Sequence, residues 1–438
     1  MALRTLNDDF RTLSSQSIST SDGCHTSHRP LHQINKNLER CQAIRIASQQ
    51  VYDALGRACT EHTEHLAHFD LHVEQEDAIQ ERKACGIKFK LAFRHVSIVG
   101  SGQGDPLWFM VDCILQDTQD IGSVGDSAEL DQLGKPLKRQ IHTPGSCGQK
   151  PSVKRVRFES LSYAEIPLLP SVTFSSTLLS TPMMRRDFCD YLRRWVGQSP
   201  AKSNVCIGML EATERCKHFV YPLPSTLDGQ NKRGTSLEGF LKAVSTKKKL
   251  YAFPQYDRLC LAKTLALAVL QYYITPWLTI AWRSEDILFF NDQRANRVAS
   301  GPNFSRPHLN VRVTGADQSK DEGSRAPRSL APNSLLFGLG VVLLEIAYSA
   351  PLKSLQRPCD LENGIENQYT DFFTARRLVN SIGREMGSSY GTIVKKLLHC
   401  DFGCGDDFSS RDLQAGYYRD VVCELDRLEQ GFRHLQIG

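Results

Sequence analysis

The densest group of possible metal ligands in this sequence combines one cysteine with four histidines: Cys59, His62, His65, His68 and His72. Cysteine and histidine are the ligands that zinc prefers. A helix would bring His62 and His65 together, whereas a strand would bring His68 and His72 together. Neither arrangement has the paired Cys-x-x-Cys spacing that is typical of a structural zinc site. The pattern favours a solvated strand face, with a metal-stapled interaction module as the alternative, and we assign no metal ligand.

A second candidate is the glycine-rich segment 100–105, Gly-Ser-Gly-Gln-Gly-Asp. Glycines let backbone amides approach a phosphate group, so such a segment could cover a nucleotide. No Gly-Lys-Ser or Gly-Lys-Thr follows, however, and the carboxylate of Asp105 would repel phosphates. The segment favours a glycine-rich hairpin over a nucleotide site.

Acidic side chains complete no catalytic arrangement in the sequence. We find no Ser/His/Asp set and no pair of carboxylates at a spacing suited to acid/base catalysis. The remaining acids of interest are Asp286, which opens the apolar stretch 286–290, and Asp401, in Asp401-Phe402-Gly403. We therefore assign no catalytic or cofactor-binding residue and expect no cofactor.

Composition and charge narrow the class of protein. The chain has 438 residues, of which 41% are hydrophobic and 23% charged, which suits a bilobal domain or two to three globular domains. Its net charge of +5 is small, so we expect no nucleic-acid partner. No apolar signal segment follows Met1 and the 14 cysteines are scattered, which predicts a cytoplasmic protein with reduced thiols.

The stretch 333–351 predicts a buried helix. Between Leu335 and Leu344 it has no charged side chain, and a helix that is apolar all round must be covered by protein or lipid. The run reaches only about ten residues, whereas a membrane span needs roughly 20, so we expect no membrane span. Gly338 and Gly340 each cost about 1 kcal/mol of helix propensity relative to alanine, which indicates close neighbouring segments.

Hydrophobic periodicity divides the chain into four parts. Residues 1–35 are rich in small polar residues and predict a disordered tail. Residues 36–116 predict one helix, at 36–59, and a small antiparallel sheet with one wet face, from strands at 68–73, 87–93 and 107–114. Residues 117–152 predict a flexible linker, and the basic residues at 135–157 offer nuclear import as an alternative to a solvated linker. The rest, 153–438, predicts strands at 153–158, 205–210, 218–221, 286–290 and 308–313, and helices at 185–196, 236–243, 256–273, 335–346, 372–386, 390–399 and 417–428.

The order of these elements resembles the large lobe of protein kinases, with a strand pair, a short and a long helix, a loop between two strands, a central helix and terminal helices. More narrowly, residues 60–432 resemble a fungal domain family of unknown function, kinase-like in fold and often found beside prion-inhibition or HeLo-type domains. The segments that carry the resemblance include Leu237-Glu238-Gly239-Phe240-Leu241, Thr275-Pro276-Trp277, Asp286-Ile287-Leu288-Phe289 and Phe337-Gly338-Leu339-Gly340-Val341.

The same resemblance implies that the chemistry of phosphoryl transfer is missing. Kinases need a strand lysine paired with a helix glutamate, a catalytic aspartate, an asparagine and a metal-binding aspartate. In the matching frame, Ala281 stands at the catalytic aspartate, Asp286 at the asparagine and Leu335 at the aspartate that ties the central helix to the catalytic loop. The helix at 185–196 has no glutamate, and no Asp-Phe-Gly precedes the central helix. The motif that begins at Asp401 comes too late, and we expect it to be a loop that ends a helix, capped by Gly403.

We therefore predict an α+β fold of the degenerate protein-kinase-like, bilobal type, with a small antiparallel β-sheet lobe and a larger, mainly helical lobe. The predicted function is that of a pseudokinase, a catalytically inactive binding or regulatory module with a protein partner, in fungal signalling or cell-death pathways. A divergent active phosphotransferase that uses Asp286 as a metal ligand is the first alternative, and the metal-stapled interaction module is the second.

Overall fold

The computed structural model describes residues 31–58, 64–75, 86–95, 106–115, 183–184, 188–198, 205–213, 216–223, 234–246, 253–290, 304–314 and 330–437. The chain divides into two compact units, one from Met1–Gln116 with Pro182–Gly438 and the other from Asp117–Thr181. Every described residue lies in the first unit. The predicted linker, its basic residues at 135–157, the strand at 153–158 and the glycine-rich segment 100–105 lie outside the described residues.

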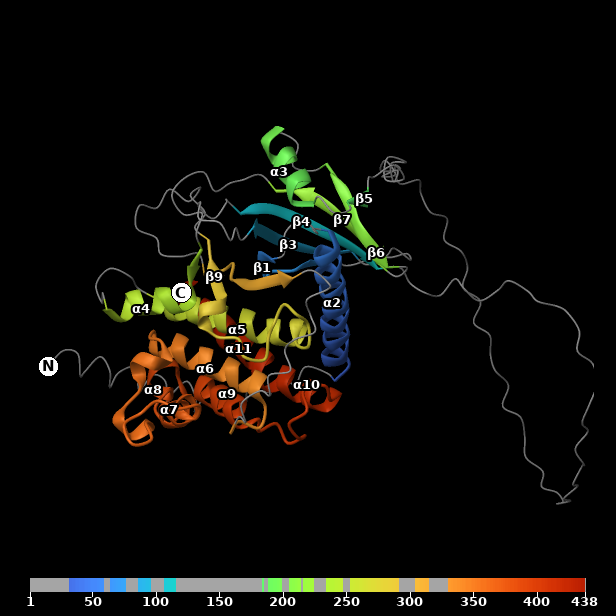
Figure 1. The fold of residues 1–438 in the computed structure, drawn as a ribbon. Coiled ribbons are helices and arrows are strands. Elements are labelled where there is room, and N and C mark those ends of the chain that lie inside the picture. Colours follow the sequence, from blue (N-terminus) through green and yellow to red (C-terminus); the bar gives the residue numbers. More distant parts are fainter. Residues whose placement is uncertain are drawn as a thin grey trace, which may run out of the picture. The chain divides into compact units, whose positions relative to one another are not determined.

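A single antiparallel sheet organises the strands (Figure 1). Its order is β5-β6-β7-β4-β3-β1-β10-β9-β8, with β2 paired to β3, and the β5–β6 pair is parallel. The strands are β1 (Glu64–Asp70), β2 (Glu74–Gln75), β3 (Gly86–His95), β4 (Leu107–Leu115), β5 (Met183–Met184), β6 (Gly208–Thr213), β7 (Cys216–Pro222), β8 (Thr235–Ser236), β9 (Ile287–Phe289) and β10 (His308–Thr314).

Alternation of apolar and polar residues places β3 and β4 as predicted, whereas β1 begins at Glu64 and ends at Asp70 instead of spanning the predicted 68–73. In β3, Ile87, Phe89 and Leu91 are at most 1% exposed, whereas Lys88 and Lys90 between them are half-buried on the opposite face. Side chains on a strand point alternately to the two faces, so one face of β3 is fully covered by the core. The other face is less open than the predicted wet face.

The sheet is larger than the predicted small sheet. It also includes β9 and β10, the strands predicted at 286–290 and 308–313. Strand β10 pairs with β1 over its whole length, from Glu64 opposite Thr314 to Asp70 opposite His308, and β9 pairs with β10. An uncovered β1 would present a row of unpaired backbone groups. Pairing with β10 satisfies these groups and joins sequence segments more than 200 residues apart into one sheet.

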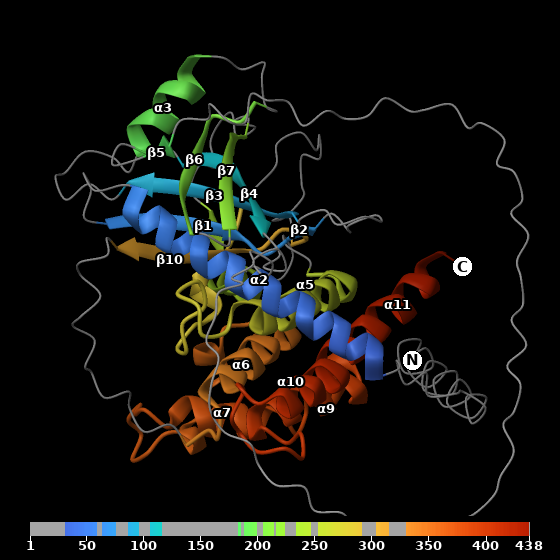
Figure 2. The same cartoon turned by 90° about the vertical axis from the view of Figure 1, so that its right-hand side faces the viewer.

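Helix α2 (Leu31–Ala58) crosses the sheet diagonally and extends down beside the C-terminal helices (Figure 2). It contacts β3, β4, β6, β7 and β10 at one end and α5 and α10 further along. It begins five residues before the predicted start, and Ile34 in this added turn already belongs to the buried stripe that continues through Leu38 and Cys41.

The central helix lies in the core, as predicted. Helix α6 (Ser334–Tyr348) is buried from Leu335 to Ala347, and it packs against α5 (Gln255–Tyr272) and α9 (Ser388–His399). A Cβ atom on Gly340 would lie 2.8 Å from the Cδ2 atom of Leu398, which confirms that glycine permits a close approach there. Among the described residues, none of the helices is both long and apolar enough to span a bilayer.

The remaining helices surround this core. They are α3 (Phe188–Gln198), α4 (Leu237–Thr246), α7 (Thr370–Leu378), α8 (Gly383–Met386), α10 (Arg411–Tyr417) and α11 (Glu424–Ile437), with a π-helical turn at Tyr418–Cys423. Ser236 caps α4 as predicted, since its Oγ accepts a hydrogen bond from the Gly239 amide at 3.0 Å. The single helix predicted at 372–386 is instead divided into α7 and α8. The Tyr348 hydroxyl donates to the Leu378 carbonyl, at 2.9 Å, where α7 ends.

Candidate functional site

In the segment that was predicted to correspond to a kinase catalytic loop, neither of the two predicted positions offers an available acid. Ala281, predicted to stand in place of the catalytic aspartate, exposes only a methyl group. Asp286 is half-buried, and its Oδ2 atom accepts a hydrogen bond from the Arg283 amide at 2.9 Å, which caps the short helix Ser284–Asp286. Burial raises the pKa of Asp286, and the hydrogen bond to the Arg283 amide opposes that rise. The only acid placed by the sequence is therefore used to hold its own loop.

Helix α6 touches this loop through an indole ring. Trp282 is 2% exposed, and a Cβ atom on Gly338 would lie 3.4 Å from the Trp282 Nε1 atom. Leu335 is also buried, so no carboxylate joins α6 to the loop at that position. The acid at the other end of α6, Glu345, accepts a hydrogen bond from the Leu352 amide at 2.7 Å. Burial raises the pKa of Glu345 to about 7, despite that hydrogen bond.

Four side chains pack together on one face of the sheet, three from strands β1, β4 and β10 and one from the residue that follows β9. We call His68, Trp108, Phe290 and His308 the sheet-face cluster. The Phe290 ring lies 5.1 Å from His68, 5.0 Å from Trp108 and 5.0 Å from His308, measured between ring centroids. Trp108 and His308 are 5.4 Å apart and nearly perpendicular. Such edge-to-face contacts favour a packed aromatic cluster.

The histidines of the sheet-face cluster are held neutral. Burial, followed by the charges of Arg94 and His308, lowers the pKa of His68 to about 3. Burial also lowers the pKa of His308, although the Asp70 carboxylate, 4.0 Å from His308 Nε2, acts in the opposite direction. Both ring nitrogens of His68, Nε1 of Trp108 and Nδ1 of His308 have no hydrogen-bond partner in the structure. Each of these buried atoms weakens the fold, because an unsatisfied buried polar group costs about 1–3 kcal/mol.

The histidines predicted as possible zinc ligands are not brought together. His65 lies on the opposite face of β1 from His68, with its Nε2 atom 3.2 Å from the Cys189 sulfur. His72 is exposed beyond the end of β1, and Cys59 and His62 lie outside the described residues. The prediction of a solvated strand face is also wrong, since His65 is 3% and His68 is 2% exposed. Aromatic rings cover them: Phe93 packs on His65 and Phe290 on His68.

The Asp-Phe-Gly motif lies in the loop after α9, as predicted. The residue that ends the helix is Cys400, in the left-handed region with φ +52°, rather than Gly403. The Asp401 amide donates to the Lys396 carbonyl at 3.0 Å, which completes the cap. Gly403 also has a positive φ, further along the loop.

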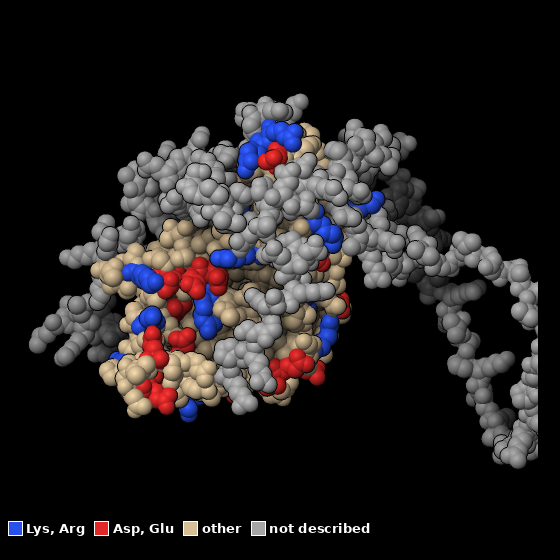
Figure 3. Space-filling view, in the orientation of Figure 1, with Lys and Arg blue, Asp and Glu red and all other residues tan. Residues whose placement is uncertain are grey.

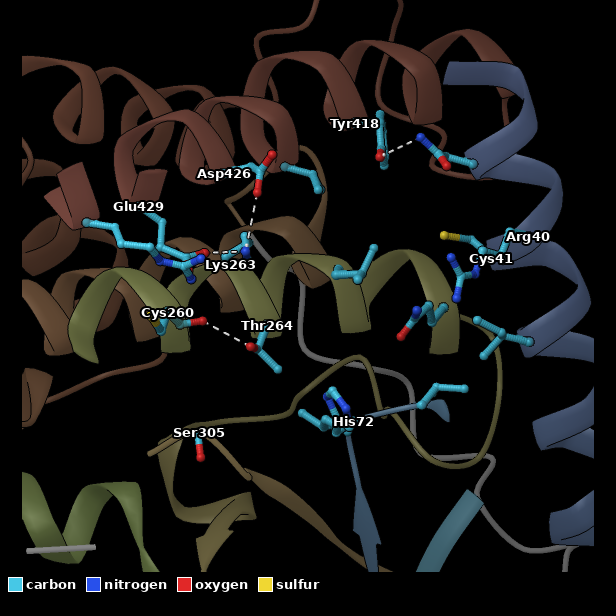
Figure 4. A pocket seen from close by; sticks show the side chains of 18 residues that line it. Arg40, Cys41, His72, Cys260, Lys263, Thr264, Ser305, Tyr418, Asp426 and Glu429 are labelled. Atoms are coloured by element: carbon cyan, nitrogen blue, oxygen red, sulfur yellow. Dashed lines mark hydrogen bonds and ion pairs between the residues drawn. The ribbon is translucent and has the colours of Figure 1, made fainter. Parts of the chain in front are cut away.

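A cavity of about 630 Å³ lies between α2, α5 and the C-terminal helices (Figure 4). Lys263 of α5 lies 3.3 Å from Asp426 and also pairs with Glu429, whose carboxylate binds Arg433 at 2.7 Å. Burial lowers the pKa of Lys263, but Glu429 and Asp426 outweigh that effect and hold it above its ordinary value. Since cations and carboxylates neutralise one another here, the pairs join α5 to α11 and supply neither a general base nor a nucleophile. On the face of the molecule in Figure 3, acidic and basic side chains of the described residues are likewise interspersed.

Sequence reasoning missed one cluster of chemically capable side chains, Cys113, Cys216 and His218, whose ligand atoms all lie within 4.8 Å of one another. The alternation Cys216-x-His218 on a strand was a signal for it, because both side chains then share one face. Their partner, Cys113, lies on a strand about a hundred residues earlier, and no local pattern connects the two.

Comparison with protein families gives one match. The family profile of the domain of unknown function DUF7580 matches residues 173–428, which is more than half of the chain. The matched span contains Asp286, α6 and most of the C-terminal helices, and it leaves α2 and strands β1 to β4 outside. No curated protein matches the chain.

Proposed function

We infer that this chain, which belongs to the family of the domain of unknown function DUF7580, is a catalytically inactive, kinase-like protein that acts by binding a protein partner. The cytoplasm, with nuclear import through residues 135–157 as the alternative, is the proposed location. The fungal signalling or cell-death context belongs to the same proposal and rests on the resemblance stated above.

The order of the elements supports the kinase-like part of the proposal. Strands β1 to β5 precede helix α3, and β6, β7 and β8 follow it before the next helix begins. In kinases the strand lysine and the helix glutamate come from elements in these places. Here β3 contains Lys88 and Lys90 and β4 contains no lysine, but α3, which would supply the paired glutamate, contains Asp190 and no glutamate. Asp190 pairs with Arg193 of its own helix instead, at 3.0 Å.

The single observation that carries the inactive assignment is the use made of Asp286. Phosphoryl transfer depends on charges held in position around the transferred group, with magnesium bound by carboxylate and amide side chains. Asp286 caps its own short helix, and Ala281, at the base position, cannot accept a proton. General-base catalysis alone is worth roughly 10²- to 10⁴-fold in rate. The sheet-face cluster adds support. Its His68 ring on β1 and its Trp108 ring on β4 both pack against Phe290, the residue that follows β9, so aromatic side chains occupy this face of the sheet.

The loop after α5 supports a role in protein binding. Ile274 is 76% exposed and Ile280 is 69% exposed. Ile274 also has a φ of +56°, which is unusual for a β-branched residue. The following residue holds this conformation in place, since the Thr275 hydroxyl donates to the Tyr272 carbonyl at 2.6 Å. An exposed apolar side chain on a strained, well-fixed loop is suited to contact with another protein.

Nucleotide-dependent melting and phosphate transfer test the inactive assignment. We expect Mg²⁺ and ATP to leave the melting temperature of the full chain unchanged, and we expect no transfer of labelled γ-phosphate to the chain itself or to a generic protein substrate. An active kinase in the same assay is the positive control. Transfer by the wild type that is lost in Asp286→Ala, but kept in the matched variant of its exposed neighbour, Glu285→Ala, would overturn the assignment.

Affinity enrichment tests the binding surface. The comparison uses the wild type, Ile280→Asp and, as the matched control, Ile365→Asp, which changes an isoleucine that is 70% exposed elsewhere in the molecule. We expect proteins enriched by the wild type and by Ile365→Asp to be lost from Ile280→Asp. The same proteins enriched equally by all three would exclude the loop as the contact surface.

A further inference from the structure

Cys113, Cys216 and His218 form a compact group on one face of the sheet. Cys113 lies directly opposite His218 in the pairing of β4 with β7. Cys216 is two residues before His218 on the same strand, so its side chain points to the same face. The Nδ1 atom of His218 is 3.2 Å from the Cys113 sulfur and 3.6 Å from the Cys216 sulfur. One ring nitrogen therefore faces two thiols.

The group is sealed inside the apolar core. Cys113 and Cys216 are fully buried and His218 is 1% exposed. The next pair on the same face, Val111 opposite Val220, is also fully buried. The other ring nitrogen of His218, Nε2, has no hydrogen-bond partner in the structure. Burying an imidazole without satisfying it is costly, so its place in this apolar core calls for an explanation.

We propose that Cys113, Cys216 and His218 bind a thiophilic d¹⁰ cation, Zn²⁺ or Cu⁺, through the two sulfur atoms and Nδ1. Zinc bonds of about 2.3 Å to sulfur and 2.0–2.1 Å to nitrogen, at a tetrahedral angle, separate a sulfur from a nitrogen by about 3.5 Å. The separations of 3.2 and 3.6 Å lie on either side of that value. Binding releases the thiol protons to solvent, because thiolate is the ligating form.

A disulfide between the two cysteines fits this geometry less well than a cation. Cys216 lies opposite Leu115, whereas Cys113 lies opposite His218, so the cysteines are diagonal neighbours across the strand pair. Diagonal neighbours have Cα atoms about 7–8 Å apart, beyond the usual span of a disulfide. Both sulfurs can still reach one cation that sits beside the imidazole.

The donor set selects the class of cation. Two soft sulfur ligands disfavour Mg²⁺ and Ca²⁺, which prefer oxygen, and suit Zn²⁺ or Cu⁺. Structural zinc almost always takes four ligands, so Zn²⁺ would add a further donor to these three. Cu⁺ is equally compatible with a set rich in sulfur. The coordination number therefore distinguishes the two cations at the same three residues.

A bound cation would join two distant parts of the chain. Cys113 and His218 are 105 residues apart in sequence. Clips that close long loops are expected to restrict the unfolded chain the most. The cation would therefore link β7 to β4, the strand pair through which β5, β6 and β7 join the rest of the sheet. This inference is independent of the proposed function, since it involves neither Asp286 nor the sheet-face cluster.

The chain supplies a matched control in a second buried thiol–imidazole contact. Cys189 and His65 lie 3.2 Å apart, and both are buried, but among the described residues no third ligand joins them in a possible metal site. Cys189→Ala removes a buried sulfur of the same kind as Cys113→Val or Cys216→Ala does. Any difference in metal content between these variants then reports the three-residue group.

The test loads the purified full chain separately with Zn²⁺, with Co²⁺ as the spectroscopic substitute for zinc, and with Cu⁺ under reducing conditions. We expect one equivalent per chain for Zn²⁺ or Cu⁺ by elemental analysis. X-ray absorption should show two sulfur ligands and at least one nitrogen ligand, and chelation should lower the melting temperature. The metal content should fall to background in Cys113→Val and in Cys216→Ala, but stay at one equivalent in Cys189→Ala.

Circular dichroism of each variant separates loss of metal from loss of fold, and the spectrum of the wild type requires no variant at all. A sulfur-to-Co²⁺ charge-transfer band supports a zinc-type site, whereas uptake of Cu⁺ with three-coordinate absorption features supports a copper site. Metal-free wild type that takes up none of the three cations, or uptake that persists in both variants, would overturn the proposal. The cluster would then be a hydrogen-bonded polar group within the core.

Discussion

Helix α6 and the sheet-face cluster are both buried, yet different interactions hold them. Leu336, Leu339 and Leu343 of α6 are fully buried in an apolar core. The sheet-face cluster places His68 and His308 in an equally dry position and leaves several ring nitrogens without a partner. The apolar stretch of α6 before Glu345 is therefore stabilised by the burial of apolar side chains, whereas the cluster combines aromatic packing with the cost of dehydrated polar atoms.

The difference between an apolar and a polar buried region shows where a fold can be altered for function. The stretch of α6 from Leu335 to Leu344 has no polar side chain, so it has nothing to gain from a ligand. A buried polar group with unmet hydrogen bonds is less favourable for stability, so its presence points to another constraint. The two regions should consequently respond in opposite ways to truncation and to pH.

The largest expected effect is the truncation of the central helix. Leu339→Ala should lower the free energy of unfolding by about 2–5 kcal/mol, because it removes apolar contacts and leaves a cavity in a region that cannot easily collapse. Urea unfolding followed by circular dichroism measures this loss. The control Leu330→Ala changes a leucine that is 48% exposed and should alter stability by about 0.5 kcal/mol or less. Equal effects of the two substitutions would show that α6 is not the centre of the core.

The sheet-face cluster should control the acid limb of stability. The pKa of His68 is lowered from 6.5 to about 3 in the folded protein. Between these values the unfolded chain binds a proton that the folded protein does not, so stability falls as pH falls through that window. His68→Gln should remove up to about 1.4 kcal/mol per pH unit from the slope. The exposed His399→Gln, at the end of α9, should leave the limb unchanged, and an equally steep limb in His68→Gln would contradict the buried, neutral state.

Glu345 should give a slope of the opposite sign. Its pKa is raised from 4.5 to about 7 by burial, so the folded protein keeps a proton that the unfolded chain has lost. The stabilising contribution is complete below about pH 4.5 and is lost as pH rises through 7. Glu345→Gln should flatten this decline, by less than the His68 effect because the shift in pKa is smaller. Unfolding measured at several pH values between 4.5 and 7 tests it, and a decline that persists in the variant would reject the assignment.

The contrast between these regions also shows what a sequence can predict. The helix stripes of α2, α5 and α6 and the alternation in β3 were visible because local periodicity reflects the face that is buried. The capping of α4 by Ser236 followed from residue type. The contacts of His68 with Phe290, and of Cys113 with His218, were not predictable, since each joins strands that only the sheet order brings together. The join of β10 to β1 escaped prediction for the same reason.

The boundaries that were wrong have local causes. In helix α2, which begins at Leu31, Ile34 extends the buried stripe beyond the predicted start, and where α7 ends the Leu378 carbonyl accepts a hydrogen bond from Tyr348 of another helix. The predicted wet face of the sheet is covered because Phe290 reaches it from beyond β9. Pattern analysis sees which side of an element is polar, but it does not see what later segment of the chain will cover that side.

The smallest expected effect is the most informative for the proposed lack of activity. Ala281→Asp places an acid at the proposed base position on an exposed loop, so stability should change by about 0.5 kcal/mol or less. We expect no transfer of labelled phosphate from Mg²⁺-ATP, because α3 still has no glutamate and Asp286 still caps its own helix. Combining Ala281→Asp with Asp286→Asn, which places an amide at the position of the kinase asparagine, should also give none. Transfer by either variant would mean that the rest of the catalytic arrangement is intact and that the residues at positions 281 and 286 alone had silenced it. The sheet-face cluster would then be compatible with a bound nucleotide. In that case the cluster would no longer be an inactivated region that differs from the structural helix α6.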